Sequence, residues 1–311
     1  MSLPADVPRP DDGLLTLYDV AQRLGVHYMT AYRYVRTGRL PGRKAGVEWR
    51  VEPADLDAFV AAGGAGAANT AGPAGPAGVD GGADRRRRRV DRAGRLMDRL
   101  VAGDEPGAWA VVQSAMASGT GPAEVYLDLI VPALEGIGDA WSAGTITVSQ
   151  EHRASGVVHR LIGRLGPQFA RRGRTRGTVV LGAPAGDRHA LPSALFADLL
   201  RGEGFSVIDL GSDTPAPSFV EAAAGAERLV AVGITATAPD NEAAVAAVVD
   251  AVRGAVDTTV VLGGGASSQA TAERLGADHW GGQGRDALAL FASLADDAGR
   301  RRRRPSRREA P

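Results

Sequence analysis

An aspartate and a histidine lie two residues apart in one loop of this 311-residue chain. Asp187 precedes His189 within the segment APAGDRHALP. A carboxylate at this spacing can accept a hydrogen bond from one ring nitrogen, which fixes the tautomer and leaves the other nitrogen to ligate a metal. A loop histidine is also often an ordinary polar surface residue, so the pair alone indicates only a candidate metal ligand.

A second group of candidate residues lies in the segment WSAGTITVSQEH. Trp141 ends a stretch with helical periodicity, Gly144 breaks it, and Glu151 and His152 follow near the start of the next helix. A large flat ring and an acid–imidazole pair can contact one ligand. A core tryptophan beside a solvated pair at a helix N-terminus explains the same residues, and both interpretations stay open at this point.

The last third of the chain must position most of these groups. Five short apolar runs, at residues 177–184, 205–211, 228–235, 258–265 and 278–281, alternate with helical stretches. This alternation predicts an α/β doubly wound parallel sheet of the flavodoxin-like type over residues 176–298. Ligands of such sheets bind at the carboxyl ends of the strands. Three polar or glycine-rich loops fall there, and they contain Asp187 with His189, Thr235 with Thr237, and Gly264 with Gly265.

The sequence pattern of residues 90–172 indicates four helices with short connections. Such a pattern predicts a four-helix bundle. Asp104 is placed to cap the second helix, and Thr147 with Gln150 has capping-box spacing at the start of the fourth. Residues 62–89 are rich in Gly, Ala and Pro and end in an arginine run, so we expect a flexible linker. Residues 299–311 contain a second arginine run and are expected to form a basic disordered tail. Each of the two arginine runs is either simply solvated or makes additional contacts with phosphate groups.

Residues 13–61 predict an all-α winged helix-turn-helix domain. Thr16 and Asp19 have capping-box spacing, and a basic segment with β-hairpin character follows the second helix. The segment from Leu14 to Val51 contains seven basic and two acidic residues. This positive net charge favours double-stranded DNA as the partner of the domain, rather than another protein. The residues expected to contact DNA are Tyr28, Thr30, Tyr32, Arg33, Arg36, Arg43 and Lys44.

Composition narrows the function classes further. The chain has no cysteine, which excludes disulfides and thiolate metal sites. Its formal net charge is zero, and no apolar run approaches the ~20 residues of a membrane span. We therefore expect a cytoplasmic protein with no membrane partner.

Two motif sets carry a family resemblance. GVHYMTAYRYVRTGRLPG resembles the MerR-like and excisionase-like winged helix-turn-helix family, and the three strand-end loops resemble the cobalamin-binding domain. The order of domains, with Trp141 and the Glu151–His152 pair in the bundle, resembles light-responsive repressors of the CarH/LitR type. Pro192, Thr235 and Thr237 replace the glycine, serine and leucine of the cobalamin motif, and Ser142 replaces the upper-ligand histidine of the photoreceptors.

The resemblance implies a cobalamin cofactor, with adenosylcobalamin expected, and a role for each candidate residue. His189 would be the lower ligand to cobalt, supported by Asp187. The nucleotide tail would be lined by Thr235, Thr237, Gly264 and Gly265, and the upper face would be contacted by Trp141, Glu151 and His152.

The expected function is a cobalamin-sensing transcriptional regulator that is not an enzyme and forms a dimer or tetramer. Ser142 would alter any response to light. Two alternatives stay open: a corrinoid carrier or methyltransferase subunit, and a regulator whose corrin site reads another ligand. The bundle and sheet domains alone fit the first alternative, whereas the basic N-terminal module argues against it.

Overall fold

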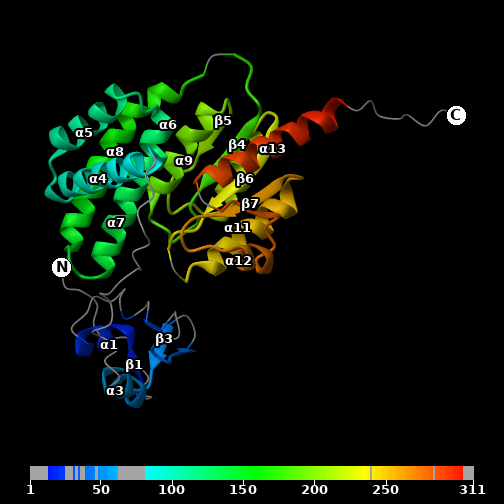
Figure 1. Cartoon of the computed structure of the whole chain (residues 1–311). Coiled ribbons are helices and arrows are strands. Elements are labelled where there is room, and N and C mark those ends of the chain that lie inside the picture. Colours follow the sequence, from blue (N-terminus) through cyan, green and yellow to red (C-terminus); the bar gives the residue numbers. More distant parts are fainter. Residues whose placement is uncertain are drawn as a thin grey trace, which may run out of the picture. The chain divides into compact units, whose positions relative to one another are not determined.

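The computed structural model describes residues 13–24, 31, 34–35, 39–45, 48–61, 81–171, 173–238, 240–282 and 284–303 (Figure 1). The chain forms two compact units. One combines Met1–Met97 with Ala133–Arg153, and the other combines Asp98–Pro132 with Ala154–Pro311.

The described N-terminal elements include a small antiparallel sheet and the helices α1 and α3. They are β1 (Leu15–Thr16), α1 (Leu17–Leu24), β2 (Arg43–Ala45), β3 (Glu48–Val51) and α3 (Pro53–Ala61), and the sheet order is β1-β3-β2. The backbone N–H of Thr16 donates to Asp19 at 3.0 Å, and that of Asp19 donates to the Thr16 hydroxyl at 3.1 Å, so the predicted capping box forms. Ala31, Tyr34 and Val35 are buried, as their helical spacing predicts.

The next elements form the helical bundle. They are α4 (Gly81–Ala102), α5 (Glu105–Ala117), α6 (Pro122–Val125), the π-helix η1 (Tyr126–Ile130), α7 (Val131–Ser142), α8 (Val148–Leu165) and the 3-10 helix η2 (Gly166–Phe169). The side chain of Asp104 caps α5 by accepting from the N–H of Gly107 at 2.9 Å. Thr147 and Gln150 form the predicted capping box before α8. Helix α4 starts at Gly81, so residues 81–89 are helical where the sequence favoured a linker.

The third bundle segment differs from the single α-helix that its periodicity predicts. The backbone N–H of Val131 donates to the carbonyl of Tyr126, five residues earlier, which is the π-helical pattern. Pro132 follows directly and has no N–H to donate to Asp128. In a regular α-helix its ring would also press against that carbonyl. The wider turn before Pro132 removes this conflict.

The parallel sheet has the predicted strands. They are β4 (Thr178–Gly182), β5 (Ser206–Asp209), β6 (Leu229–Thr235), β7 (Thr259–Gly263) and β8 (His279–Trp280), and the order is β5-β4-β6-β7-β8 with all pairs parallel. The helices after the strands are α9 (Ala190–Gly202), α10 (Ala216–Gly225), α11 (Glu242–Ala255), α12 (Gln269–Arg274) and α13 (Gly284–Arg303). This arrangement confirms the doubly wound sheet after a helical bundle.

Helices cover both faces of this sheet (Figure 1). On one face Val179 and Leu181 pack with Leu200 of α9 and Phe291 of α13. On the other face the strands pack with α10, α11 and α12. Because helices cover both faces of the sheet, the side chains on both faces of the central strands β4, β6 and β7 are largely buried. This burial explains why the sequences of these strands are continuous apolar runs.

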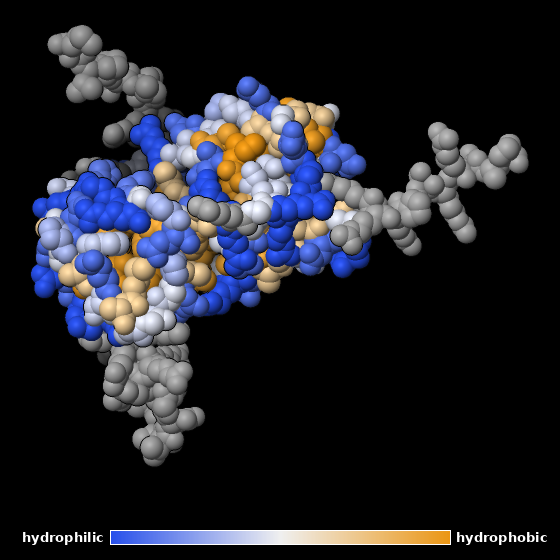
Figure 2. Space-filling view, turned by 90° about the horizontal axis from the view of Figure 1, so that it is seen from above, coloured by the Kyte–Doolittle hydropathy of each residue, from blue (hydrophilic) through white to orange (hydrophobic). Residues whose placement is uncertain are grey.

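The chain end also differs from its predicted state. Helix α13 continues to Arg303, so the start of the expected disordered tail is helical. Among the described helices, none is both long and apolar enough to cross a membrane. In the face drawn in Figure 2 the hydrophobic residues form separate areas between hydrophilic ones.

Candidate functional site

Three loops meet at the carboxyl edge of the parallel sheet. Asp187 and His189 follow β4, Thr235 ends β6, and Gly264 follows β7. Because β4, β6 and β7 are neighbouring parallel strands, their carboxyl ends lie at one edge. The sheet thus brings together the three loops that were singled out in the sequence.

Asp187 holds His189 in one orientation. The Nδ1 atom of His189 lies 2.7 Å from Oδ1 of Asp187, and the backbone N–H of His189 donates to the same oxygen at 3.1 Å. The Asp187 side chain has no solvent exposure, whereas that of His189 is 55% exposed. Because Nδ1 is engaged by the carboxylate, a metal would be bound through Nε2.

The second oxygen of Asp187 is held by the backbone of the loop after β6. The N–H groups of Thr237 and Ala238 donate to Oδ2 at 2.6 and 2.8 Å. Burial alone would raise the pKa of Asp187, but the bonds from His189, Ala238 and Thr237 outweigh it and lower the pKa below its ordinary value. Sequence reasoning placed Thr237 in the site for its side chain and missed this backbone role.

The glycine-rich loop approaches the same region closely. Gly264 has a φ of +96°, and a Cβ there would lie 2.3 Å from the carbonyl oxygen of Ala236. The hydroxyl of Ser267 donates to the Gly264 carbonyl at 2.8 Å, and Trp280 Nε1 donates to Ser267 at 3.1 Å. Only glycine fits at position 264, because both its φ and its surroundings exclude a side chain. Ser267 and Trp280 were not predicted.

Further polar contacts that the sequence did not reveal fix the His189 loop. The N–H of Gly186 donates to Asp213 at 2.7 Å. The hydroxyl of Ser193, which is fully buried in the first turn of α9, donates to Asp209 at 2.6 Å. Asp213 has a φ of 54°, an unusual conformation outside glycine, but a positive φ leaves no reliable mark in a sequence.

The upstream candidates lie at the junction of α7 and α8. Trp141 is the penultimate residue of α7, and Gly144 adopts a φ of 72° in the turn that follows. Glu151 and His152 lie in the first turns of α8, with a carboxylate oxygen 2.5 Å from the Nδ1 atom of His152. The His152 side chain is 75% exposed. The helix break and the acid–imidazole pair therefore exist as predicted, within one compact unit.

The predicted DNA-contacting residues fall into two groups. Arg43 is exposed and lies with Lys44 on β2. The others, which are Tyr28, Thr30, Tyr32, Arg33 and Arg36, lie outside the described residues.

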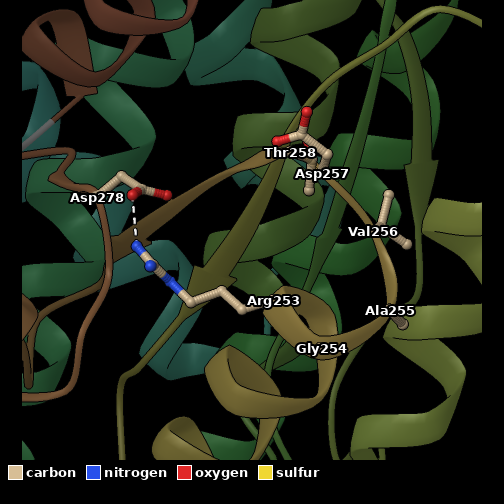
Figure 3. Close-up of a pocket in the computed structure, with 7 residues that line it drawn as sticks. All are labelled: Arg253, Gly254, Ala255, Val256, Asp257, Thr258 and Asp278. Atoms are coloured by element: carbon tan, nitrogen blue, oxygen red, sulfur yellow. Dashed lines mark hydrogen bonds and ion pairs between the residues drawn. The ribbon is translucent and has the colours of Figure 1, made fainter.

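A cavity of about 470 Å³ lies elsewhere on the sheet domain (Figure 3). It is lined by residues 253–258 and Asp278, and Asp278 pairs with the guanidinium of Arg253. These residues precede β7 and β8, so the cavity lies at the amino edge of the sheet. It is therefore distinct from the His189 site at the carboxyl edge.

Comparison with known proteins identifies the domains. Residues 93–165 and residues 177–292 each match a family described as a B12 binding domain, and residues 14–64 match a helix-turn-helix domain. The chain is similar to trimethylamine corrinoid protein 1 of Methanosarcina mazei, at 27% identity over 62% of this chain and 91% of that protein. It is also similar to a corrinoid protein of Desulfitobacterium hafniense, at 26% identity over 63% of this chain and 93% of that protein.

A solved structure supports the fold. The monomethylamine corrinoid protein of Methanosarcina barkeri aligns with a TM-score of 0.59 at 20% identity, and it covers 66% of this chain and 99% of that chain. The aligned share corresponds in extent to the bundle and the sheet domain together. At this identity the likeness concerns the fold alone.

These relatives correct the function expected from the sequence. The prediction of a cobalamin-sensing transcriptional regulator, with light sensing as one possible role, is wrong, because the relatives are named corrinoid proteins, several of them trimethylamine or dimethylamine corrinoid proteins, and favour a corrinoid carrier. The resemblance to the CarH/LitR type had rested on the presence of the helix-turn-helix module and on a few cap residues. The expectation that the chain is not itself an enzyme agrees with the names of the relatives.

The site also fits a corrin on its own geometry. The Thr237 hydroxyl is buried and has no hydrogen-bond partner within the described part of the chain, which leaves it available to a bound ligand. Among the described residues, no group of three or more His, Asp or Glu side chains could hold a metal ion. The chain thus carries a helix-turn-helix domain followed by two B12-binding domains, and its cofactor is a corrinoid.

Proposed function

We propose that the chain is a corrinoid carrier that accepts a methyl group from one partner methyltransferase and presents it to another. The observation that carries this proposal is the fully buried carboxylate of Asp187, which fixes His189 at the carboxyl edge of the sheet. Similarity to trimethylamine and dimethylamine corrinoid proteins, which covers about nine-tenths of several of them, supports the same function.

Each residue of the site has a part in this proposal. His189 would ligate the cobalt of the corrin through Nε2, and Asp187 fixes the tautomer of its ring. The loops that contain Thr235, Thr237, Gly264 and Gly265 would hold part of the cofactor. Trp141, Glu151 and His152 remain candidate contacts for the cofactor.

The corrin cobalt supplies the methyl-carrying centre when it is bound. The chain contributes orientation and control of the lower ligand. Because Asp187 is ionised and buried, it strengthens the hydrogen bond from the His189 ring and makes that ring a better electron donor. The hydrogen bonds from Thr237 and Ala238 keep the carboxylate in place throughout.

The proposal is tested with the full chain saturated with hydroxocobalamin. After reduction, methyl iodide is added and the methylated corrin is followed by absorbance, and a thiolate is then added as acceptor. A carrier takes up and releases one methyl group per chain over repeated cycles. A bound corrin that cannot be methylated, or whose methyl group is inert while free methylcobalamin reacts, would falsify the proposal.

We also propose double-stranded DNA as a partner of residues 14–64. The match to a helix-turn-helix domain and the exposed Arg43 on the β2–β3 pair support this partner. Binding that falls steeply with salt in a gel-shift experiment is the expected result. A homo-oligomer of two or four copies is a further proposal, which sedimentation of the cobalamin-bound chain would test.

A further inference from the structure

A buried hydrogen bond joins the bundle to the helix that follows His189. The hydroxyl of Tyr126 donates to Oδ2 of Asp198 at 2.9 Å. Tyr126 has no solvent exposure and Asp198 is 6% exposed. Seventy-two positions separate the two residues along the chain, so the bond is a tertiary contact rather than a local one.

Asp198 belongs to the same rigid helix as the candidate cobalt ligand. His189 is the N-cap residue of α9, and Asp198 lies in the second half of that helix. The first turn of α9 is tied to β5 by the bond from Ser193 to Asp209. Helix α9 is therefore held at both ends, near His189 by Ser193 and in its second half by the bond from Tyr126 to Asp198.

The surroundings of Tyr126 leave its ring little freedom. The ring centroids of Tyr126 and Phe169 are 4.7 Å apart, and a Cβ at Gly202 of α9 would lie 3.0 Å from the Phe169 ring. Phe169 thus fills the space between the tyrosine and the end of α9. A phenylalanine at position 126 would keep this packing and lose only the hydroxyl.

The π-helical turn sets Tyr126 and its successors against the sheet domain. Leu127 lies so close to Gly284 that a Cβ there would be 3.0 Å away, and Asp128 pairs with Arg285 at 3.2 Å. Three consecutive residues of η1 therefore contact α9 or α13. Such π-turns are rare and occur often at functional sites.

The protonation state suits a donor role. Burial, followed by the charge and the hydrogen bond of Asp198, raises the pKa of Tyr126 far above its ordinary value. The hydroxyl keeps its proton and donates to the carboxylate. Asp198 also accepts from Arg201 at 2.8 Å, so loss of Tyr126 would leave one of its oxygens short of a buried donor.

We infer that Tyr126 and Asp198 are positioning residues that set how firmly His189 ligates the cobalt. The bond fixes α9 against the bundle, and α9 carries His189 at its first turn. This inference rests on the proposed role of His189 as the lower ligand. It extends the site to a bundle residue with no contact to the ligand loop itself.

The test uses the full chain saturated with methylcobalamin. The His189-ligated fraction is read from absorbance, and imidazole is titrated as a competing lower ligand. In the Tyr126→Phe variant, the imidazole concentration for half-displacement should fall about three- to tenfold, a factor that matches the net worth of one hydrogen bond. Asp198→Leu removes the acceptor of the same hydrogen bond and should lower the imidazole concentration for half-displacement in the same way. Either variant therefore tests the inference, provided that it folds.

Two controls separate positioning from general stability. Asp198→Asn keeps an acceptor for the Tyr126 hydroxyl and should retain the wild-type imidazole response. Tyr34→Phe removes a buried tyrosine hydroxyl from the N-terminal domain and should leave the response unchanged. A Tyr126→Phe variant with lowered thermal stability but an unaltered imidazole titration would overturn the inference. If the wild-type chain itself shows no histidine ligation, the proposed role of His189 as the cobalt ligand is wrong, which is a different result from failure of the Tyr126–Asp198 inference.

Discussion

Asp187 holds His189 at two points, since one carboxylate oxygen lies 2.7 Å from the ring Nδ1 and 3.1 Å from the backbone nitrogen of the same residue. The double contact fixes both the ring and the start of α9. The pair therefore acts as one unit, and its two members can be tested separately.

Substitution His189→Ala should weaken cobalamin binding and remove the histidine-ligated absorbance spectrum, because the strand-end loops offer no other imidazole. Titration of the full chain with methylcobalamin measures both effects. His159→Ala is the matched control, since His159 lies on α8 with its ring bonded to the carbonyl of Ser155. Equal spectra for the wild-type chain and His189→Ala would rule out His189 as the ligand.

Substitution Asp187→Asn should lower the free energy of unfolding by about 2–3 kcal/mol, because the amide nitrogen would face backbone donors inside the protein. Urea denaturation of the cobalamin-free chain measures the loss. The folded-state pKa of Asp187 is lowered, so its contribution is present in full above the ordinary pKa of about 4 and is lost as pH falls through the lower folded-state pKa.

The difference between the wild-type chain and Asp187→Asn should therefore stay constant from roughly neutral pH down to about pH 4 and shrink at more acidic pH. A difference that does not shrink at strongly acidic pH would contradict the hydrogen-bonded, ionised carboxylate described for the site.

Substitution Gly264→Ala should destabilise the sheet domain by about 2 kcal/mol or more, because alanine disfavours the positive φ and its Cβ would meet the Ala236 carbonyl. Gly265→Ala is the control within the same loop, since a Cβ there meets nothing within 4 Å. It should fold like the wild-type chain and weaken only cobalamin binding. Equal melting temperatures for the two variants would show that the loop is not confined as described.

Substitution Arg43→Ala should lower the salt dependence of DNA binding by about one unit of slope, the effect of one lost phosphate contact. Gel-shift titrations at several salt concentrations measure the slope. Arg171→Ala removes an exposed arginine after the bundle and should leave it unchanged. Identical slopes for the wild-type chain and both variants would remove Arg43 from the proposed interface.

Much of the fold follows from sequence pattern alone. The strand runs, the caps at Asp104 and Thr147, and the order of bundle and sheet are all local signals. The π-turn before Pro132 was missed because a proline permits either a kink or a wider turn. The extension of α13 to Arg303 was missed because its arginine-rich end resembles a solvated tail.

The site was predicted less completely than the fold. Asp187 and His189 stand two residues apart, so their contact was visible in the sequence. The hydrogen bonds from Thr237 and Ala238 reach Asp187, about fifty residues earlier in the chain. They are donated by backbone N–H groups, which are the same in nearly every residue type and so cannot be recognised in a sequence. Ser193 and Asp209 meet only because α9 packs beside β5.

The backbone support of Asp187 has a consequence for sequence divergence. Every residue except proline has the N–H that positions 237 and 238 supply, so drift in these side chains leaves the histidine ligand correctly held. Thr237, which replaces the leucine of the cobalamin motif, is thus a tolerated substitution at this support. Searches that require that leucine will overlook proteins whose ligand loop is structurally intact.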